Sequence, residues 1–300
     1  MARGTRSRGK HDGMNLFVFG LGFTARRFVE RAAGRFGEIR ATVTDPARPG
    51  AGLGDVALRG FGPETDDARI AGDLADTDVL LVSAPPSRDG DTVLARYRDA
   101  IADSRIGWIG YLSTIGIYGD QQGAWIDETT PPNPTSGRSH GRIAVEKAWL
   151  AFGQETGKAV QVFRLSGIYG PGRNPIVKLR EGKSQRIIKP GQVFNRIHVD
   201  DIATTLLASI DRPRAQAIYN VTDDEPTPPQ VVTEYAAGLA NLPLPPEIDF
   251  ETADLSPMAR SFYGENKRVR NRLIREELGV DLAYPTYREG LAALVADARA

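Results

Sequence analysis

The chain of 300 residues contains no cysteine and only three histidines. The lack of cysteine excludes disulfides, a thiol nucleophile and zinc sites built on thiolate ligands. The histidines, His11, His140 and His198, are scattered along the sequence, which argues against a histidine-based metal site. We therefore expect no metal centre.

An excess of charge of one sign is also missing, because 38 acidic residues balance 38 basic ones. A neutral chain has no electrostatic footprint for duplex nucleic acid or for an anionic membrane. No apolar run is long enough to span a bilayer. The composition is that of an ordinary globular protein with one large or two modest domains. We expect a cytoplasmic protein that acts on a small molecule, with neither nucleic acid nor membrane as a partner.

Residues 1–13 differ from the rest of the chain. Arg3, Arg6, Arg8 and Lys10 lie there among glycine and serine, and no apolar segment of the kind found in secretory signals accompanies them. We interpret this stretch as a disordered basic tail, or as residues upstream of a natural start at Met14.

A glycine-rich turn near the start is the most informative feature that is present. The apolar, strand-like residues 16–19 lead into Gly20, Gly22 and Ala25, and a helical pattern follows. Gly20 allows a tight turn, Gly22 lets the backbone approach a pyrophosphate, and Ala25 keeps helix and strand close. This spacing predicts a dinucleotide-binding loop in which backbone N–H groups at the helix start bind the anion, whereas a plain glycine loop is the alternative. The expected cofactor-binding residues are Gly20, Gly22, Phe23, Thr24 and Ala25.

A second indication of a nucleotide is an acid after the next predicted strand. Residues 39–44 read as a strand, and Asp45 follows them. A carboxylate there can accept hydrogen bonds from the ribose hydroxyls of NAD, and it would repel the additional phosphate of NADP. Asp45 can instead begin a turn before Pro46, and Arg48 can pair with a phosphate. The pattern leans to NAD, and NADP stays open.

The order of elements indicates an α/β protein. Strand-like apolar runs alternate with helical patterns, which predicts a Rossmann-type doubly wound parallel sheet with helices on both faces. Prolines cluster between residues 226 and 246, and short elements replace the alternation there, which predicts a smaller C-terminal lobe. The predicted NAD(P)-binding domain covers residues 14–168 and about 196–222, and the substrate lobe covers about 169–195 and 223–300. Strands are predicted at 16–19, 39–44, 56–58, 79–82, 106–112 and 160–165, and helices at 92–104, about 139–153 and 202–210.

Ligands in such sheets lie beyond the carboxyl ends of the strands. Ala84 and Pro85 follow the fourth predicted strand, and Ser113 follows the fifth. We expect all three to contact the cofactor.

Five further segments, in the same order, resemble the extended short-chain dehydrogenase/reductase family of NAD-dependent epimerases and dehydratases. They are LSTIGIYG at 112–119, Glu128 with prolines 131, 132 and 134, FRLSGIYGPGR at 163–173, RIHVDDIA at 196–203 and YNV at 219–221. The resemblance covers most of the chain from residue 15 onward. It implies hydride transfer, or an epimerase or dehydratase reaction, on a small hydroxylated or nucleotide-sugar-like substrate. It also implies a homodimer formed through the helices near 92–104 and 139–153.

The chain departs from this family at the catalytic pair. The family uses a Tyr and a Lys one helical turn apart, with a Ser or Thr after the fifth strand, and Thr114 matches the latter. Counting back from Glu146 places Arg138 at the Tyr position and Arg142 at the Lys position. A guanidinium stays protonated, so neither arginine replaces the acid, although Arg142 can hold the cofactor ribose. This loss makes the chain an atypical member, and it leaves a non-catalytic NAD(P)-binding module or redox sensor as the alternative.

Other groups near the predicted crevice are candidates for the acid–base role. Tyr118 either supplies a phenol to the reaction or packs in a turn. His140 is expected to be a surface or capping residue, because a helix points it away from Arg142. Asp200 and Asp201 either form a carboxylate pair or cap the following helix.

Two arginines are candidates for binding the substrate. Arg173 follows Gly170, Pro171 and Gly172 and can bind a phosphate or carboxylate, or it is a solvated loop residue. Arg268 either faces the cleft or belongs to the exposed basic face of an amphipathic helix at 266–271.

Overall fold

The computed structural model describes residues 13–62 and 65–297, and the chain divides into two compact units. Unit 1 contains Met1–Leu112, Ala144–Val162 and Ser209–Ala217, and unit 2 contains Ser113–Ile143, Phe163–Ala208 and Ile218–Ala300. The predicted tail at residues 1–13 lies, apart from Gly13, outside the described residues. The predicted division into functional lobes has different boundaries and stays a prediction.

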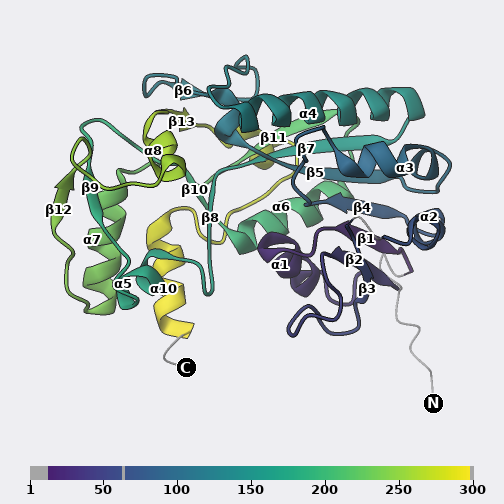
Figure 1. Cartoon of the computed structure of the whole chain (residues 1–300), viewed down its shortest axis with the longest axis horizontal. Helices are drawn as coiled ribbons and strands as arrows, with labels where there is room; N and C mark the ends of the chain where they lie inside the picture. The colour runs from purple at the N-terminus through teal and green to yellow at the C-terminus, as the bar shows by residue number, and fades with distance from the viewer. Residues whose placement is uncertain (1–12, 63–64, 298–300) are drawn as a thin grey trace. The chain divides into compact units, whose positions relative to one another are not determined.

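One seven-stranded sheet carries the fold (Figure 1). β1 pairs in parallel with both β2 and β4, so the strand order reverses direction at β1. This is the strand order of a doubly wound Rossmann sheet, and the predicted fold class is confirmed. The order is β3 (Ala57–Gly60), β2 (Ile39–Val43), β1 (Leu16–Phe19), β4 (Val79–Val82), β5 (Trp108–Thr114), β7 (Ala159–Leu165) and β11 (Ala217–Val221).

The composition of the strands follows from their places in the sheet. β1 reads LFVF and β4 reads VLLV, and every residue of both is buried. A parallel strand covered on both faces has no position for a polar side chain unless that side chain finds a partner. β3 lies at the edge, where its residues are half-buried and Arg59 is accommodated.

Three helices of unit 1 connect the first strands. α1 (Phe23–Arg31) joins β1 to β2, α2 (Asp67–Ala75) joins β3 to β4, and α3 (Thr92–Ala102) joins β4 to β5. Right-handed crossovers that run in opposite directions from β1 place α1 on one face of the sheet and α2 and α3 on the other. α2 and α3 are accordingly in contact, with Arg96 Nη2 2.6 Å from Asp67 Oδ1.

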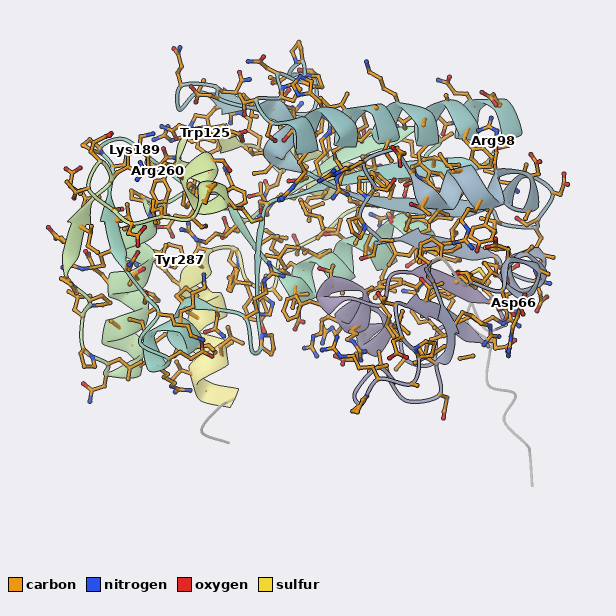
Figure 2. The ribbon with its side chains drawn as sticks, viewed as in Figure 1. Asp66, Arg98, Trp125, Lys189, Arg260 and Tyr287 are labelled. Carbon is orange, nitrogen blue, oxygen red and sulfur yellow. The ribbon has the colours of Figure 1, made fainter. Side chains whose placement is uncertain are left out.

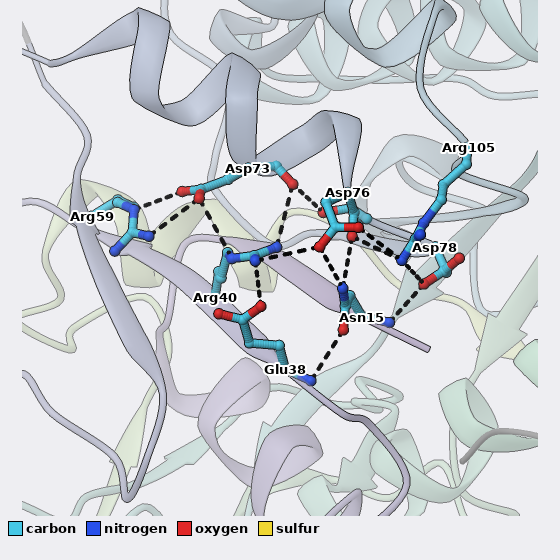
Figure 3. A network of polar contacts seen from close by, with 9 residues as sticks. Asn15, Glu38, Arg40, Arg59, Asp73, Asp76, Asp78 and Arg105 are labelled. Carbon is cyan, nitrogen blue, oxygen red and sulfur yellow. Dashed lines mark hydrogen bonds and ion pairs between the residues drawn. The ribbon is translucent and has the colours of Figure 1, made fainter. Parts of the chain in front are cut away.

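A network of charged residues joins α2 to two strands (Figure 3). The Asp73 carboxylate, near the end of α2, accepts hydrogen bonds from Arg59 Nε at 2.6 Å and Nη2 at 3.2 Å. Arg40 Nε on β2 lies 3.4 Å from the same carboxylate. Asp76, just after the helix, contacts Arg105 at 3.1 Å and Asn15 at 2.8 Å.

Unit 2 combines short strands with helices. Its small sheets are the parallel pairs β8–β10, β9–β12 and β6–β13. In one of its cores, Tyr287 (labelled in Figure 2) and Leu291 pack with Val232 and Ala236.

Among the described residues, no helix is both long and apolar enough to cross a bilayer. The remaining elements are η1 (Ile115–Tyr118), β6 (Trp125–Ile126), α4 (Gly137–Thr156), β8 (Gly167–Tyr169), α5 (Pro175–Arg180), β9 (Arg186–Ile188), β10 (Arg196–His198), α6 (Val199–Asp211), α7 (Pro229–Ala240), β12 (Glu247–Asp249), α8 (Pro257–Tyr263), β13 (Arg268–Val269), α9 (Arg272–Glu276) and α10 (Tyr287–Asp297).

Candidate cofactor loop and catalytic region

The turn after β1 requires glycine at its first position. Gly20 has φ +87°, a left-handed conformation that side-chain-bearing residues rarely adopt. A Cβ on Gly20 would also lie only 2.8 Å from the backbone nitrogen of Ala84. Backbone conformation and close packing therefore both explain this glycine.

Hydrogen bonds hold the turn against the two neighbouring strands. Gly20 N–H donates to Thr42 Oγ1 at 2.8 Å, and Leu21 N–H donates to the Thr42 carbonyl at 2.8 Å. Ala84 N–H donates to the Phe19 carbonyl at 2.8 Å. Thr42 was not among the predicted site residues, although a lone hydroxyl in a buried strand was a readable signal. The loop after β1 is thus tied to β2, and the loop after β4 is tied to the end of β1, all within unit 1.

Gly22 has a different environment from Gly20. It is the N-cap residue of α1, and a Cβ on it would meet no atom within 4 Å. No side chain caps α1 and no acid lies in its first turn, whereas Asp66 and Asp91 cap α2 and α3. The open space at Gly22 therefore lies at the positive end of a helix dipole, where an anion is stabilised. Thr24 and Ala25 are buried behind it.

The loop after β2 contains Asp45 and is anchored from α1. Asp45 is exposed, and its Oδ1 accepts the N–H of Ala47 at 2.9 Å, so the residue does form the turn that was one of its two interpretations. Arg26 of α1 donates to the carbonyls of Gly50 at 3.0 Å and Gly52 at 2.9 Å. Arg26 had not been predicted as a site residue, and its role is to fix this loop beside the start of its own helix.

The remaining predicted cofactor residues of unit 1 are accessible. Arg48 and Pro85 are exposed, and Ala84 is half-buried. Each lies just beyond the carboxyl end of its strand, as predicted, and their contact with a nucleotide stays a prediction.

In unit 2, the end of β5 forms a tight turn around Thr114. Ser113 is buried and Thr114 is half-buried. Thr114 Oγ1 accepts the N–H of Gly116 at 3.1 Å and so begins η1.

At the start of α4 the structure buries Ser139, whereas Arg138, at the position of the family's tyrosine, is exposed. Ser136 Oγ accepts the N–H of Ser139 at 3.2 Å and caps the helix. His140 Nδ1 lies 2.9 Å from the Ser136 carbonyl, which can only accept, so Nδ1 donates there. Arg138 and His140 are exposed, Arg142 is half-buried, and Ser139 is buried with an exposed fraction of 8%. His140 is a surface and capping residue, as expected.

Tyr118 lies in a buried polar cluster. Its exposed fraction is 0%, its hydroxyl donates to Asn220 Oδ1 at 2.9 Å, and it accepts from Arg164 Nη1 at 2.8 Å. Burial raises the pKa of Tyr118, and the charge of Arg164 only partly opposes this effect. Glu128 Oε1 accepts the N–H of Asn220 at 2.8 Å. These contacts agree with the packing interpretation of Tyr118 and give no support to the catalytic one.

The two predicted substrate arginines differ in their surroundings. Arg173 is exposed in a turn in which its backbone exchanges hydrogen bonds with Gly170 at 2.9 and 3.1 Å. Arg268 lies in β13, and its guanidinium donates to the carbonyl of Gly123. The amphipathic helix, which was one of the two interpretations of residues 266–271, does not form at residues 268–269, because these pair in parallel with β6.

The RIHVDDIA segment has a structural role that differs in part from the predicted one. His198 Nδ1, not an aspartate, accepts the N–H of Asp200 at 3.2 Å at the start of α6. Asp201 accepts the N–H groups of Ala283 at 2.7 Å and Tyr284 at 3.1 Å. The carboxylate of Asp201 thus anchors the C-terminal segment of unit 2.

Comparison of the sequence with known proteins shows which family this chain is similar to. The NAD dependent epimerase/dehydratase family matches residues 95–222. The chain is also 30% identical over 219 residues to protein YeeZ of Escherichia coli strain K12, an alignment that covers 71% of this chain and 73% of the relative.

Solved structures extend the similarity to nearly the whole chain. A conserved protein of unknown function from Silicibacter pomeroyi DSS is 50% identical, with a TM-score of 0.86 over 95% of this chain and 99% of that one. UDP-glucose 4-epimerase of Thermotoga maritima, solved with UDP-glucose, is 16% identical with a TM-score of 0.79 over 95% and 99%. dTDP-glucose 4,6-dehydratase of Bacillus anthracis strain Ames, solved with NAD, is 18% identical with a TM-score of 0.74 over 95% and 96%. The last two share the fold with this chain.

Proposed function

This chain belongs to the NAD-dependent epimerase/dehydratase family, and from that premise we propose that it binds NAD or NADP at residues 20–25 and converts a nucleotide-sugar-like substrate. The observation that carries the proposal is the open space at Gly22. The fold accounts for glycine at position 20, but neither backbone conformation nor packing demands it at position 22. A pyrophosphate seated on the uncapped start of α1 supplies the missing reason.

The adjoining residues fit the rest of a dinucleotide. Asp45 uses one carboxylate oxygen for its own turn, and we assign ribose binding to the other. Arg48 lies three residues further along the same exposed loop, where it is available to a phosphate. Ala84 and Pro85 line the neighbouring strand end. The carboxylate leads us to propose NAD over NADP.

The substrate class comes from the structural neighbours. Two of them were solved with UDP-glucose or NAD, and this chain covers nearly their full length. When bound, the nicotinamide would accept a hydride from a substrate carbon or return one. Thr114 would donate a hydrogen bond to the oxygen on that carbon, and Arg142 would hold the cofactor ribose. Arg173 is exposed, and we propose that it binds a substrate phosphate. The guanidinium of Arg268 donates a hydrogen bond to the carbonyl of Gly123.

A non-catalytic nucleotide-binding module is the second candidate. It is favoured by the start of α4, where Arg138 replaces the family's tyrosine and is exposed. NAD binding without conversion of a nucleotide sugar would identify this function. If conversion is found and neither Thr114→Val nor Tyr118→Phe changes its rate, the placement of the active site is wrong.

The substitution Gly22→Asp tests the cofactor site. Aspartate is a good N-cap residue and has room here, so we expect the unliganded variant to unfold at or above the wild-type temperature. The added carboxylate would repel a pyrophosphate. We therefore expect the affinity for NAD to fall by about 100-fold or more, which corresponds to roughly 3 kcal/mol. Thermal unfolding with and without NAD or NADP, supported by calorimetry, measures both effects.

The matched control is Gly107→Asp. A Cβ on Gly107 would also meet no atom within 4 Å, and this glycine precedes β5, at the opposite end of the strands from the glycine turn. The control variant should respond to NAD as the wild type does. A Gly22→Asp variant that NAD still stabilises, or a wild type that responds to neither nucleotide, would contradict the proposal.

A further inference from the structure

Two hydroxyl groups in unit 2 flank the place where Gly116 lacks a side chain. A Cβ on Gly116 would lie 3.4 Å from Thr114 Oγ1 and 3.6 Å from Ser139 Oγ. Both distances are ordinary van der Waals contacts, so the gap between the hydroxyls has room for one small group. Thr114 and Gly116 are half-buried, which gives solvent, and therefore a ligand, access to the gap.

Both hydroxyls already use an acceptor position and keep a proton to donate. Thr114 Oγ1 accepts the N–H of Gly116 at 3.1 Å. The Ser136 hydroxyl donates a hydrogen bond to Ser139 Oγ at 3.0 Å. Ser136 Oγ in turn accepts the backbone N–H of Ser139. A hydroxyl has one donor and two acceptor positions. Within residues 13–62 and 65–297, neither Thr114 nor Ser139 has a side-chain acceptor for its proton.

We propose that Thr114 and Ser139 together donate two hydrogen bonds to one oxygen of the substrate, the oxygen on the reacting carbon. The inference rests on the proposed function and adds to it a residue, Ser139, that neither the family pattern nor the sequence analysis assigned. Two preoriented donors stabilise the negative charge that develops on this oxygen when a hydride is delivered to its carbon. The proton that completes the alcohol, or that leaves it in the reverse step, is exchanged with solvent water and not with either hydroxyl. The two hydroxyls thus supply hydrogen bonds to the oxygen that the family's tyrosine would contact. Arg138, which stands at the tyrosine position, is exposed and does not supply them.

The phase of α4 explains why Ser139 takes this place. Ser136 caps the helix, which begins at Gly137. The first turn consequently exposes Arg138 and buries Ser139, and Arg142 follows Ser139 by three residues, one helical turn away. Serine and arginine therefore share a face of the helix at its start.

Four variants test the pair in the NAD-loaded, full-length protein, with UDP-glucose and dTDP-glucose as probes and product formation followed by NMR. Ser139→Ala removes one donor, and we expect kcat to fall by about 100-fold while KM changes by less than about threefold. Thr114→Val should behave similarly, and Thr114→Ser should restore most of the rate. Gly116→Ala fills the gap with a methyl group and should abolish conversion while leaving unfolding temperature and NAD affinity unchanged.

His140→Ala is the control, because His140 lies in the same turn of α4 but is exposed. It should keep the wild-type kcat. The pH profile of Ser139→Ala should have the wild-type shape, since the serine transfers no proton.

The outcomes separate this inference from the function on which it rests. If wild type converts a probe and Ser139→Ala or Gly116→Ala does so equally well, the donor pair is refuted and the proposed function stands. If wild type binds NAD but converts neither probe, the nucleotide-sugar assignment and the donor pair both fall. If neither NAD nor NADP binds, the cofactor site itself is refuted.

Discussion

At the scale of single residues, Asp223 makes the stability of the protein depend on pH. Its exposed fraction is 1%, Oδ1 accepts the N–H of Glu225 at 3.3 Å, and Oδ2 has no hydrogen-bond partner among the described residues. Burial raises the pKa of this carboxyl well above 3.8, against the smaller opposing effect of Arg196. The folded state thus holds the proton to higher pH than the unfolded chain, so stability present at low pH is lost as pH rises from 3.8 through the folded-state pKa.

Asp223→Asn removes this titration. We expect the variant to be more stable than wild type at neutral pH and to show a smaller decline in free energy of unfolding above pH 3.8, because only the part due to Asp223 is removed. Urea unfolding at a series of pH values measures it, with the exposed Asp254→Asn as the control that should leave the slope unchanged. A variant with the wild-type pH dependence would show that Asp223 is ionised in the folded state at little cost.

The residues of the candidate site were only partly predictable from sequence. The spacing of Gly20, Gly22 and Ala25 predicted the loop. Gly20 has a conformational and a steric reason, whereas the reason that we propose for Gly22 is a bound pyrophosphate. The contacts of Thr42 and the buried position of Ser139 were missed, since they depend on which strand lies alongside and on where α4 begins. The cap residue Ser136, three positions before Ser139, carried the information about the helix start.

At the scale of elements, Asp73 links α2 to β2 and β3 (Figure 3). Its side chain is largely buried, with Arg40 and Arg59 as partners. Removing the carboxylate leaves two poorly solvated guanidinium groups close together, so we expect Asp73→Ala to cost about 3 kcal/mol in free energy of unfolding. Denaturant titration gives this value directly.

Asp76→Ala is the comparison within the same network. The Asp76 carboxylate is half exposed, and its contacts with Arg105 and Asn15 are surface contacts. Its removal should cost less than about 1 kcal/mol. Equal losses for Asp73→Ala and Asp76→Ala would show that burial does not set the strength of these pairs.

The bounds of some helices and strands could be predicted from the sequence, and those of others could not. β1 and β4 have the predicted bounds, and β2 and β7 differ by one residue, because continuous apolar runs define strands that are covered on both faces. The paired strands β6–β13 and β9–β12 were not predicted, since two or three residues carry no periodic pattern and their partners are far away in the chain. That non-local pairing is also why residues 268–269 form a strand and not the helix that was one of the two interpretations.

At the scale of the whole molecule, the chain passes between the two units five times. The crossings, at 112/113, 143/144, 162/163, 208/209 and 217/218, all fall inside β5, α4, β7, α6 and β11. A flexible linker between domains would instead place each crossing in an exposed loop. Because no crossing can open without breaking a helix or a strand, we expect one cooperative unfolding transition.

Tryptophan fluorescence tests this expectation, since Trp108 and Trp149 belong to unit 1 and Trp125 belongs to unit 2. Trp125→Phe leaves probes in unit 1 alone, and the double variant Trp108→Phe/Trp149→Phe leaves the half-exposed Trp125 (labelled in Figure 2) as the probe of unit 2. In each variant, the urea transition followed by fluorescence should coincide with that followed by far-UV circular dichroism, because two-state unfolding gives every probe the same midpoint. Comparing the two signals within one variant removes the effect of the substitutions on stability. Fluorescence and dichroism midpoints that differ in either variant would mean that one unit unfolds before the other, and that the shared strands and helices do not couple them.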